Sequence, residues 1–179
     1  TANRRLTVFK RYFRWALRER FITADPTMKL QSARQPLRVP TTLTEAQVEL
    51  LLGAPDVDAP LGLRDRTMLE LMYASGLRVS ELVTLKTFNV SMNEGVLRVL
   101  GKGNKQRTVP FGAPALAALT GWLTDGRPAL TTPESGAALL LGARGRRVDP
   151  RQVRTVVHQT VAAVDGAPDM GPHGLRHSA

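Results

Sequence analysis

Three separate stretches of the chain carry side chains of the types that can bind and cleave a phosphodiester without a metal. These side chains are Arg78, Lys102, His173 and Arg176. The planar fork of an arginine matches two phosphate oxygens and keeps its charge, so two arginines can stabilise the charge of a five-coordinate transition state. A lysine can protonate the departing 5′ oxygen, and a histidine can accept a proton near neutral pH. The four residue types therefore indicate chemistry at a phosphate, provided that the fold brings them together.

Each residue also has an ordinary structural interpretation, which the sequence leaves open. Arg78 follows a glycine at a predicted turn between two helices, where it can simply pair with Glu81 on one helical face. Glu81 can equally hold the guanidinium in place for a ligand. Lys102 can be a solvated turn residue between two glycines, and His173 can be a capping or packing group at a helix start.

The spacing of the last motif places two of its side chains on one side of a helix. His173 and Arg176 are three residues apart at a predicted helix start, so both project in a similar direction. His177 is adjacent to Arg176 and points about 100° away around the helix. We therefore interpret His177 as a structural residue.

The sequence predicts a mainly α fold with a small antiparallel β-sheet, an α+β class. Residues 96–100 and 106–110 are strand-like and flank a glycine-rich turn at 101–105, which indicates a β-hairpin. Residues 139–141 are interpreted as a short strand or a buried link. Apolar spacing predicts helices elsewhere in the chain, at 3–21, 44–52, 64–73, 80–85, 113–123 and 149–164, with another opening at residue 173.

Two of these helices have clear start signals. Thr44 with Gln47 forms a capping-box pattern. Asp149 before Pro150 is typical of an N-cap followed by a proline in the first turn. The starts of these two helices are therefore predicted more sharply than the others.

The domain organisation follows from one basic helix and one linker. Residues 1–30 are interpreted as the tail of a truncated N-terminal unit, because one helix followed by a linker is not a domain. Residues 31–42 carry two prolines and two arginines without periodicity, which is typical of an extended linker. Residues 43–179 form the main predicted domain.

Positive charge is concentrated at the two ends of the chain. The formal net charge is +10; residues 1–40 hold ten basic and two acidic side chains, whereas residues 41–143 are nearly neutral. This distribution favours docking against a polyanion such as double-stranded DNA over general solubility. The basic residues that we expect to contact DNA are Arg4, Arg11, Arg14, Arg18, Lys105 and Arg107.

Composition also excludes several classes of site. The chain has no cysteine, which excludes disulfides, thiolate catalysis and cysteine-based zinc sites and fits a cytoplasmic, reducing environment. Acidic residues are scattered without metal-ligand spacing, so a metal-dependent nuclease is disfavoured and we expect no metal and no cofactor. No apolar run approaches the length of a membrane span.

The three motifs resemble those of the tyrosine recombinases, or phage integrase family, and their residues and spacing are most similar to those of the Xer-type chromosome-dimer recombinases. The motifs are the runs Gly-Leu-Arg-Val-Ser-Glu-Leu, Gly-Lys-Gly-Asn-Lys and His-x-x-Arg. The resemblance extends over essentially all 179 residues. It implies a DNA strand-exchange enzyme that works through a covalent 3′-phosphotyrosine. Arg78 and Arg176 would clamp the scissile phosphate, Lys102 would be the general acid, and His173 would assist the nucleophile.

The resemblance also implies a catalytic domain that is incomplete in these residues and is preceded by the last helix of a helical core-binding domain. The only tyrosines, Tyr12 and Tyr73, lie in other motifs, so neither carries over as the nucleophile. We therefore expect the chain as given to bind DNA without cleaving it. The implied partners are a homo- or hetero-tetramer of recombinases and a DNA translocase, in chromosome partition at cell division.

A second hypothesis is that the protein binds DNA but catalyses no reaction. A non-catalytic DNA-binding module could use the basic helix and the hairpin merely to grip phosphates. In that case Arg78, Lys102, His173 and Arg176 should be dispersed, and several should be engaged in salt bridges. A recombinase instead requires them to meet on one concave basic surface.

Overall fold

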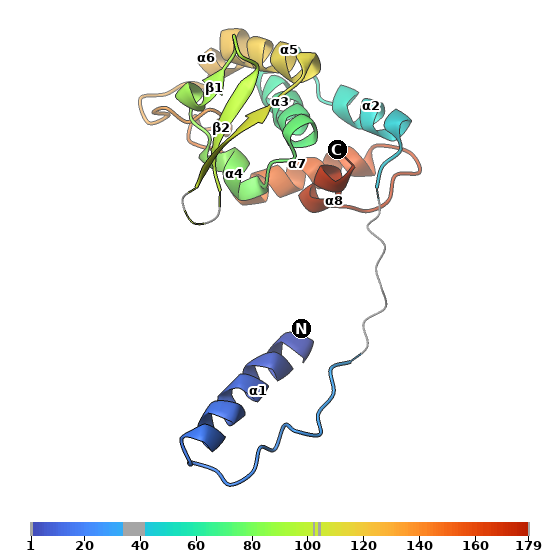
Figure 1. Ribbon diagram of the computed structural model, residues 1–179. Helices are drawn as coiled ribbons and strands as arrows, with labels where there is room; N and C mark the ends of the chain where they lie inside the picture. Colours follow the sequence, from blue (N-terminus) through green and yellow to red (C-terminus); the bar gives the residue numbers. More distant parts are fainter. Residues whose placement is uncertain (1, 34–41, 102, 104, 179) are drawn as a thin grey trace. The chain divides into compact units, whose positions relative to one another are not determined.

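The computed structural model describes residues 2–33, 42–101, 103 and 105–178. Figure 1 shows two compact units, Thr1–Val39 and Pro40–Ala179. Most of the predicted linker at 31–42 lies outside the described residues, so this assignment and the domain limits drawn from it remain predictions.

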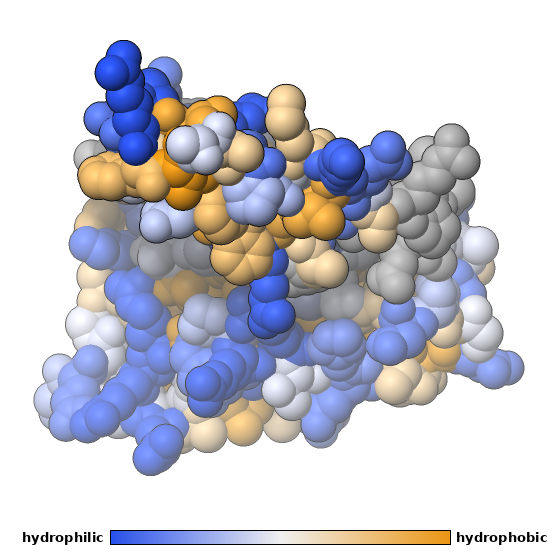
Figure 2. All heavy atoms as spheres, turned by 90° about the horizontal axis from the view of Figure 1, so that it is seen from below, coloured by the Kyte–Doolittle hydropathy of each residue, from blue (hydrophilic) through white to orange (hydrophobic). Residues whose placement is uncertain are grey.

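A single helix dominates the N-terminal unit. α1 (Ala2–Arg18) is shorter than the predicted 3–21, and Arg20 beyond its end adopts a left-handed φ of 62°. The Asn3 amide donates to the Ala33 carbonyl and accepts from the Ala33 N–H, both at 2.9 Å, which joins the two ends of the described segment. Apolar side chains of α1 such as Phe9 and Trp15 are exposed. On the face of the molecule drawn in Figure 2, exposed apolar residues, in orange, lie among hydrophilic residues, in blue.

The second unit is built around α3 (Pro60–Ser75), which is buried on several sides. Met68, Leu69, Leu71 and Met72 are all inaccessible to solvent. The helix begins four residues before the predicted Arg64, with Pro60 in its first turn. The helical segments around it are α2 (Glu45–Gly53), α4 (Val79–Thr84), η1 (Thr87–Asn89), α5 (Ala113–Gly121), η3 (Trp122–Gly126), α6 (Arg127–Leu130), α7 (Pro150–Ala162) and α8 (Pro172–His177).

Both predicted start signals are present in the structure. Thr44 accepts from the Gln47 N–H while the Gln47 side chain accepts from the Thr44 N–H, which completes the capping box of α2. The Asp149 carboxylate accepts from the N–H groups of Arg151 and Gln152 at the start of α7. These caps satisfy backbone donors that the helix itself leaves unbonded.

A small antiparallel sheet lies beside these helices (Figure 1). Its strands are β1 (Val90–Ser91), β2 (Val96–Leu100) and β3 (Gln106–Pro110), in the order β1-β2-β3. β2 and β3 pair from Val96 opposite Pro110 to Leu100 opposite Gln106, which confirms the two predicted hairpin strands. In β2, Leu97 and Val99 are buried while Arg98 and Leu100 are exposed, as expected for a sheet with one covered face.

The segment around residues 139–141 is the buried link that the sequence suggested as one alternative. Leu139 and Leu141 are fully buried, and the segment makes only isolated bridges, of which one pairs Leu141 with Arg147. The Leu139 carbonyl accepts from the indole N–H of the buried Trp122 at 2.9 Å. The fold is thus mainly α with one small antiparallel sheet, as predicted. Across the described ranges, no helix is long and apolar enough to cross a membrane.

Candidate active site

The turn between α3 and α4 places Arg78 at the surface. Gly76 ends α3 in the left-handed region with φ 55°, where a side chain is disfavoured. Leu77 is almost completely buried and anchors the turn. Arg78 follows as the N-cap residue of α4, and 57% of its side chain is exposed. The local sequence therefore ends the buried helix α3 with a turn, after which the Arg78 guanidinium faces outward.

The second motif arginine lies beside the same turn. A Cβ placed on Gly76 would be 3.8 Å from Cγ and 4.0 Å from Nε of Arg176. α8, which carries Arg176, packs against α3 and α7 and is anchored by the fully buried Leu175. The fold thus brings Arg176 next to the residue two positions before Arg78, although 98 residues separate the two arginines in the sequence.

α8 is also fixed at its C-terminal end. The Ser178 hydroxyl accepts from the Leu43 N–H at 2.9 Å and donates to the Gly174 carbonyl at 3.2 Å. Gly174 itself approaches Met170 so closely that a Cβ would be 2.9 Å from the Met170 Sδ. Packing therefore constrains the helix that presents the motif histidine.

The two histidines of α8 are in direct contact. The Nε2 atoms of His173 and His177 are 3.0 Å apart, and both residues are exposed. The interpretation of His177 as a structural residue considered only its direction relative to the neighbouring Arg176. The two histidines are four positions apart in the sequence, so they share one helical face.

Glu81 joins Arg78 to the sheet. Its Oε2 accepts from the Arg78 N–H at 2.9 Å, and its Oε1 accepts from Arg78 Nη1 at 3.1 Å. Arg107 of β3 donates to both carboxylate oxygens, with Nη1 2.7 Å from Oε1 and Nη2 3.0 Å from Oε2. Only 5% of the Glu81 side chain is exposed. The sequence left open whether Glu81 simply pairs with Arg78 or holds its guanidinium in place. The network is compatible with both, since Glu81 pairs with Arg78 and is itself fixed by Arg107.

This network changes the acidity of the carboxyl group. Hydrogen bonds from Arg107 are the largest cause, and with those from Arg78 they lower the pKa of Glu81 from 4.5 to about 2. Burial acts in the opposite direction but is outweighed. Glu81 is therefore ionised at neutral pH and offsets one of the two arginine charges.

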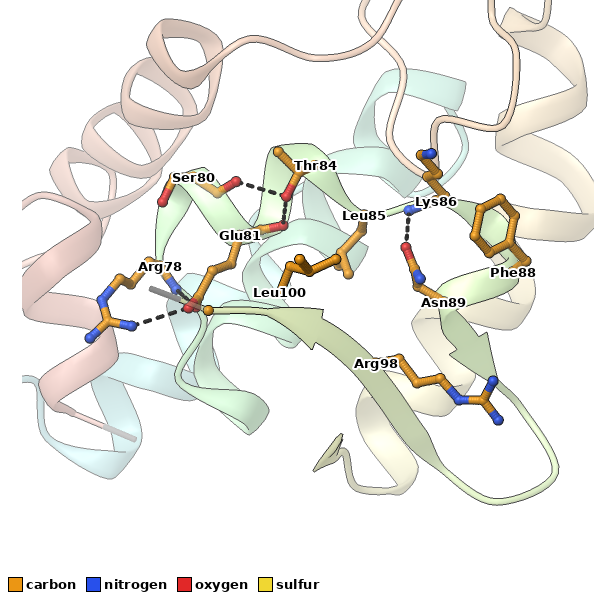
Figure 3. Close-up of a pocket in the computed structure, with 11 residues that line it drawn as sticks. Arg78, Ser80, Glu81, Thr84, Leu85, Lys86, Phe88, Asn89, Arg98 and Leu100 are labelled. Atoms are coloured by element: carbon orange, nitrogen blue, oxygen red, sulfur yellow. Dashed lines mark hydrogen bonds and ion pairs between the residues drawn. The ribbon is translucent and has the colours of Figure 1, made fainter. Parts of the chain in front are cut away.

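A basic groove of about 770 Å³ opens beside Arg78 (Figure 3). Arg78 and Arg98 lie at opposite ends of the labelled residues in this view, and Glu81 lies beside Arg78. Lys86 and the exposed Phe88 also line the groove, on the side away from Arg78 in Figure 3, with the Lys86 Nζ 5.3 Å from the Phe88 ring centroid. Cations and an exposed aromatic ring along one groove are suited to a polyanion.

The hairpin turn leads into the same network. Lys102 lies outside the described residues, but its neighbour Gly101 donates to the Lys105 carbonyl at 2.8 Å. A Cβ on Gly101 would be 3.2 Å from Arg107 Nη1. Lys105 is exposed. Arg107, which the sequence predicts to contact DNA, directs its guanidinium at Glu81.

The remaining predicted DNA contacts lie on α1. These exposed residues are Arg4, Arg11, Arg14 and Arg18. Arg18 contacts Glu19 at 3.0 Å, an exposed pair of the kind that contributes little to stability. The four side chains are accessible on one helix, as a phosphate-contacting role requires.

Comparison with known proteins agrees with the motifs. The model of the phage integrase family matches residues 41–179. The tyrosine recombinases XerC of Mycobacterium sp. (strain KMS) and of Mycobacterium tuberculosis (strain ATCC 25177 / H37Ra) are each 55% identical to the chain over 183 residues. These alignments cover 100% of this chain and 61% of each relative, so the chain spans less than two thirds of their length.

Solved structures show the same fold at low sequence identity. The XerA recombinase has a TM-score of 0.68 at 22% identity, covering 95% of this chain and 65% of that one. A lambda integrase dimer bound to a COC′ core site has a TM-score of 0.75 at 20% identity, covering 99% and 64%. The Tn1549 transposon integrase in complex with circular intermediate DNA has a TM-score of 0.77 at 18% identity, and the match covers 98% of this chain and 63% of that one. On its motifs, its family match and its relatives, the chain belongs to the phage integrase family, the tyrosine recombinases.

Proposed function

We propose that the full-length protein is a site-specific DNA recombinase that cleaves and rejoins strands through a 3′-phosphotyrosine intermediate. The observation that carries the proposal is the placement of Arg176 beside Gly76, at the turn that presents Arg78. Two guanidinium groups carried next to the same turn can donate to both non-bridging oxygens of a single phosphate. Relatives named tyrosine recombinase XerC support the same assignment.

In the proposed reaction, a tyrosine oxygen forms a bond to phosphorus while the bond from phosphorus to the 5′ oxygen breaks. Arg78 and Arg176 hold the non-bridging oxygens, whose negative charge rises in the transition state. Lys102 gives a proton to the departing 5′ oxygen, and His173 accepts or shares the proton of the tyrosine. Rejoining is the reverse, with a 5′ hydroxyl attacking the phosphotyrosine.

Neither tyrosine of these 179 residues is proposed as the nucleophile. Tyr73 packs against the core of the second unit, and Tyr12 lies on α1 of the other unit. We therefore propose that the 179 residues alone bind DNA without forming the covalent adduct. The activity must accordingly be tested in the full-length protein.

The decisive experiment offers the full-length protein a nicked suicide DNA substrate. The expected result is a protein–DNA adduct that survives denaturation. Arg78→Lys should abolish the adduct while DNA affinity is largely retained, because lysine cannot reproduce the bidentate fork. Arg98→Lys is a matched control, since Arg98 lines the far end of the same groove. Absence of any adduct, or equal loss of binding and cleavage in Arg78→Lys, would refute the assigned reaction.

A second candidate function is DNA binding without chemistry. It is favoured by the exposed arginines of α1, which can contact phosphates whether or not a strand is cut. Tight, salt-sensitive DNA binding by the full-length protein with no adduct would support this candidate instead.

We further propose a role in resolving chromosome dimers, with a homo- or hetero-tetramer of recombinases on two duplexes, a DNA translocase as partner, and a cytoplasmic location. The XerC names of the relatives support this role. Deletion of the gene should leave a fraction of dividing cells with unresolved chromosomes, and the Arg78→Lys protein should not rescue them.

A further inference from the structure

Arg107 is engaged more completely than a phosphate-contacting arginine would be. Its two terminal nitrogens donate to the two carboxylate oxygens of Glu81 at 2.7 and 3.0 Å, which is the bidentate fork geometry of a strong ion pair. The hydrogen bonds also raise the pKa of Arg107 further above its ordinary value. This guanidinium is therefore committed to a protein partner in the absence of DNA.

The partner carboxylate is saturated. A carboxylate offers about four acceptor sites. Oε1 of Glu81 accepts from Nη1 of both Arg78 and Arg107, and Oε2 accepts from the Arg78 N–H and from Arg107 Nη2. Arg107 thus supplies half of the donors that define the Glu81 position, and Glu81 in turn contacts both the backbone and the side chain of Arg78.

Arg107 also reaches the hairpin turn. Its Nη1 lies 3.2 Å from the position that a Cβ on Gly101 would occupy, so the guanidinium rests against the glycine that precedes Lys102. The Gly101 N–H closes the turn onto the Lys105 carbonyl at 2.8 Å. One side chain therefore lies between the base of the turn and the carboxylate that holds Arg78.

The charges explain why two arginines share one carboxylate. If Glu81 paired with Arg78 alone, its negative charge would cancel the charge of the arginine that faces the groove. With Arg107 on the same carboxylate, the three groups together carry a net positive charge. The carboxylate can then orient Arg78 without removing the local attraction for a phosphate.

We propose that Arg107 is a positioning residue, which fixes Glu81 and through it Arg78 and holds the base of the hairpin turn, and that it does not itself bind a DNA phosphate. This assignment replaces the sequence-based expectation of a DNA contact at Arg107. The placement of Arg78 follows from the contacts alone. Its effect on strand cleavage rests on the proposed function.

The test compares three variants of the 179-residue chain: Arg107→Gln, Arg107→Lys and the control Arg98→Gln. Arg98 lies in the adjacent strand of the same hairpin, opposite Thr108, and is exposed at the far end of the groove. Its substitution removes the same charge from the same hairpin. NMR would follow the side-chain NH signals of Arg78 and the pH titration of the Glu81 carboxyl.

For a positioning role, Arg107→Gln shifts the Arg78 signals and moves the Glu81 titration to higher pH, whereas Arg98→Gln changes neither. Arg107→Lys should resemble Arg107→Gln, because lysine keeps the charge but lacks the fork. If Arg107→Gln does not fold, the conservative Arg107→Lys still decides the question. Unchanged Arg78 signals in a folded Arg107 variant would overturn the proposal.

DNA binding gives an independent readout. An arginine that contacts a phosphate reduces the slope of log affinity against log salt by about 1 when it is removed. The positioning role predicts that the slope of Arg107→Gln stays within error of the unsubstituted chain, because no phosphate contact is lost. A loss of slope of about 1 in Arg107→Gln that Arg107→Lys restores, with Arg78 unaffected, would identify a phosphate contact and reject positioning.

Cleavage by the full-length protein separates this inference from the proposed function. Arg107→Lys should slow adduct formation by about tenfold or more, since small displacements of a catalytic group are costly, while DNA affinity is retained. If Arg78→Lys still forms the adduct at the normal rate, the proposed function fails. If Arg78→Lys abolishes the adduct but Arg107→Lys leaves its rate unchanged, only the positioning role fails.

Discussion

The strongest pH-dependent prediction concerns the stability of the second unit and the Glu81 carboxyl. Its pKa falls from 4.5 to about 2 on folding, so the folded state favours the ionised form. A group with a lowered folded pKa adds stability that is fully present above its unfolded pKa and is lost as the pH falls toward the folded value. The Glu81 contribution should therefore be complete above about pH 5 and decline between pH 4.5 and 2.

The size of this contribution can be estimated from the same values. The difference between 4.5 and about 2, at about 1.4 kcal/mol per pH unit, corresponds to about 3 kcal/mol. Arg78 and Arg107 are partly exposed, at 57% and 37% of their side chains, so solvent screening reduces the figure. We expect about 1–2 kcal/mol at neutral pH, of which more than half is lost by about pH 3.

Urea unfolding of Glu81→Gln tests this estimate at several pH values from 6 to 3. A Trp15→Phe background leaves the buried Trp122 as the only tryptophan, so that fluorescence reports on the second unit. The unsubstituted and Glu81→Gln proteins should differ at pH 6, and the difference should shrink by more than half by pH 3. Glu134→Gln is the control, since Glu134 pairs with Arg146 at the surface and its loss should matter little. Parallel stability curves for the first two proteins would refute the reasoning.

Three further predictions concern other parts of the chain. Trp122→Ala should lower the free energy of unfolding by about 3–5 kcal/mol in urea titrations followed by circular dichroism, because Trp122 is completely buried; a loss below about 1 kcal/mol would contradict this core position. Gly76→Ala should cost about 1–2 kcal/mol through its left-handed backbone alone, since the space around it is open to 3.8 Å; an unchanged urea midpoint would argue against that conformation. Arg14→Gln should reduce the salt slope of DNA binding by about 1, whereas Arg127→Gln should not, because Arg127 donates to backbone carbonyls.

The elements that periodicity defines were predictable, and their ends were less so. The two hairpin strands and the caps of α2 and α7 agree with the sequence, because alternation and capping are local signals. The early start of α3 was missed although Pro60 is typical of a first helical turn. The early end of α1 had no such signal, since the left-handed residue beyond it is Arg20 and not a glycine.

The candidate site was predictable as a set of residue types but not as a network. No local pattern relates Glu81 to Arg107, because the contact spans 26 residues. One signal was nevertheless available, since strand alternation places Arg107 on the same face as Val109, which packs against the core. The charge of an arginine on that partly buried face is stabilised by a carboxylate partner, and this signal points to a contact within the protein. The contact of His173 with His177 likewise follows from helical spacing once the pair is considered together.

The saturated carboxylate has a consequence for the movement of protons. With a pKa of about 2, Glu81 is almost entirely ionised at pH 7, and its four acceptor positions are already filled. It therefore cannot serve as a relay between a hydroxyl group and water. In the proposed reaction, acid–base steps near this turn fall to side chains that can exchange hydrogen ions at neutral pH, and Glu81 is a fixed electrostatic anchor.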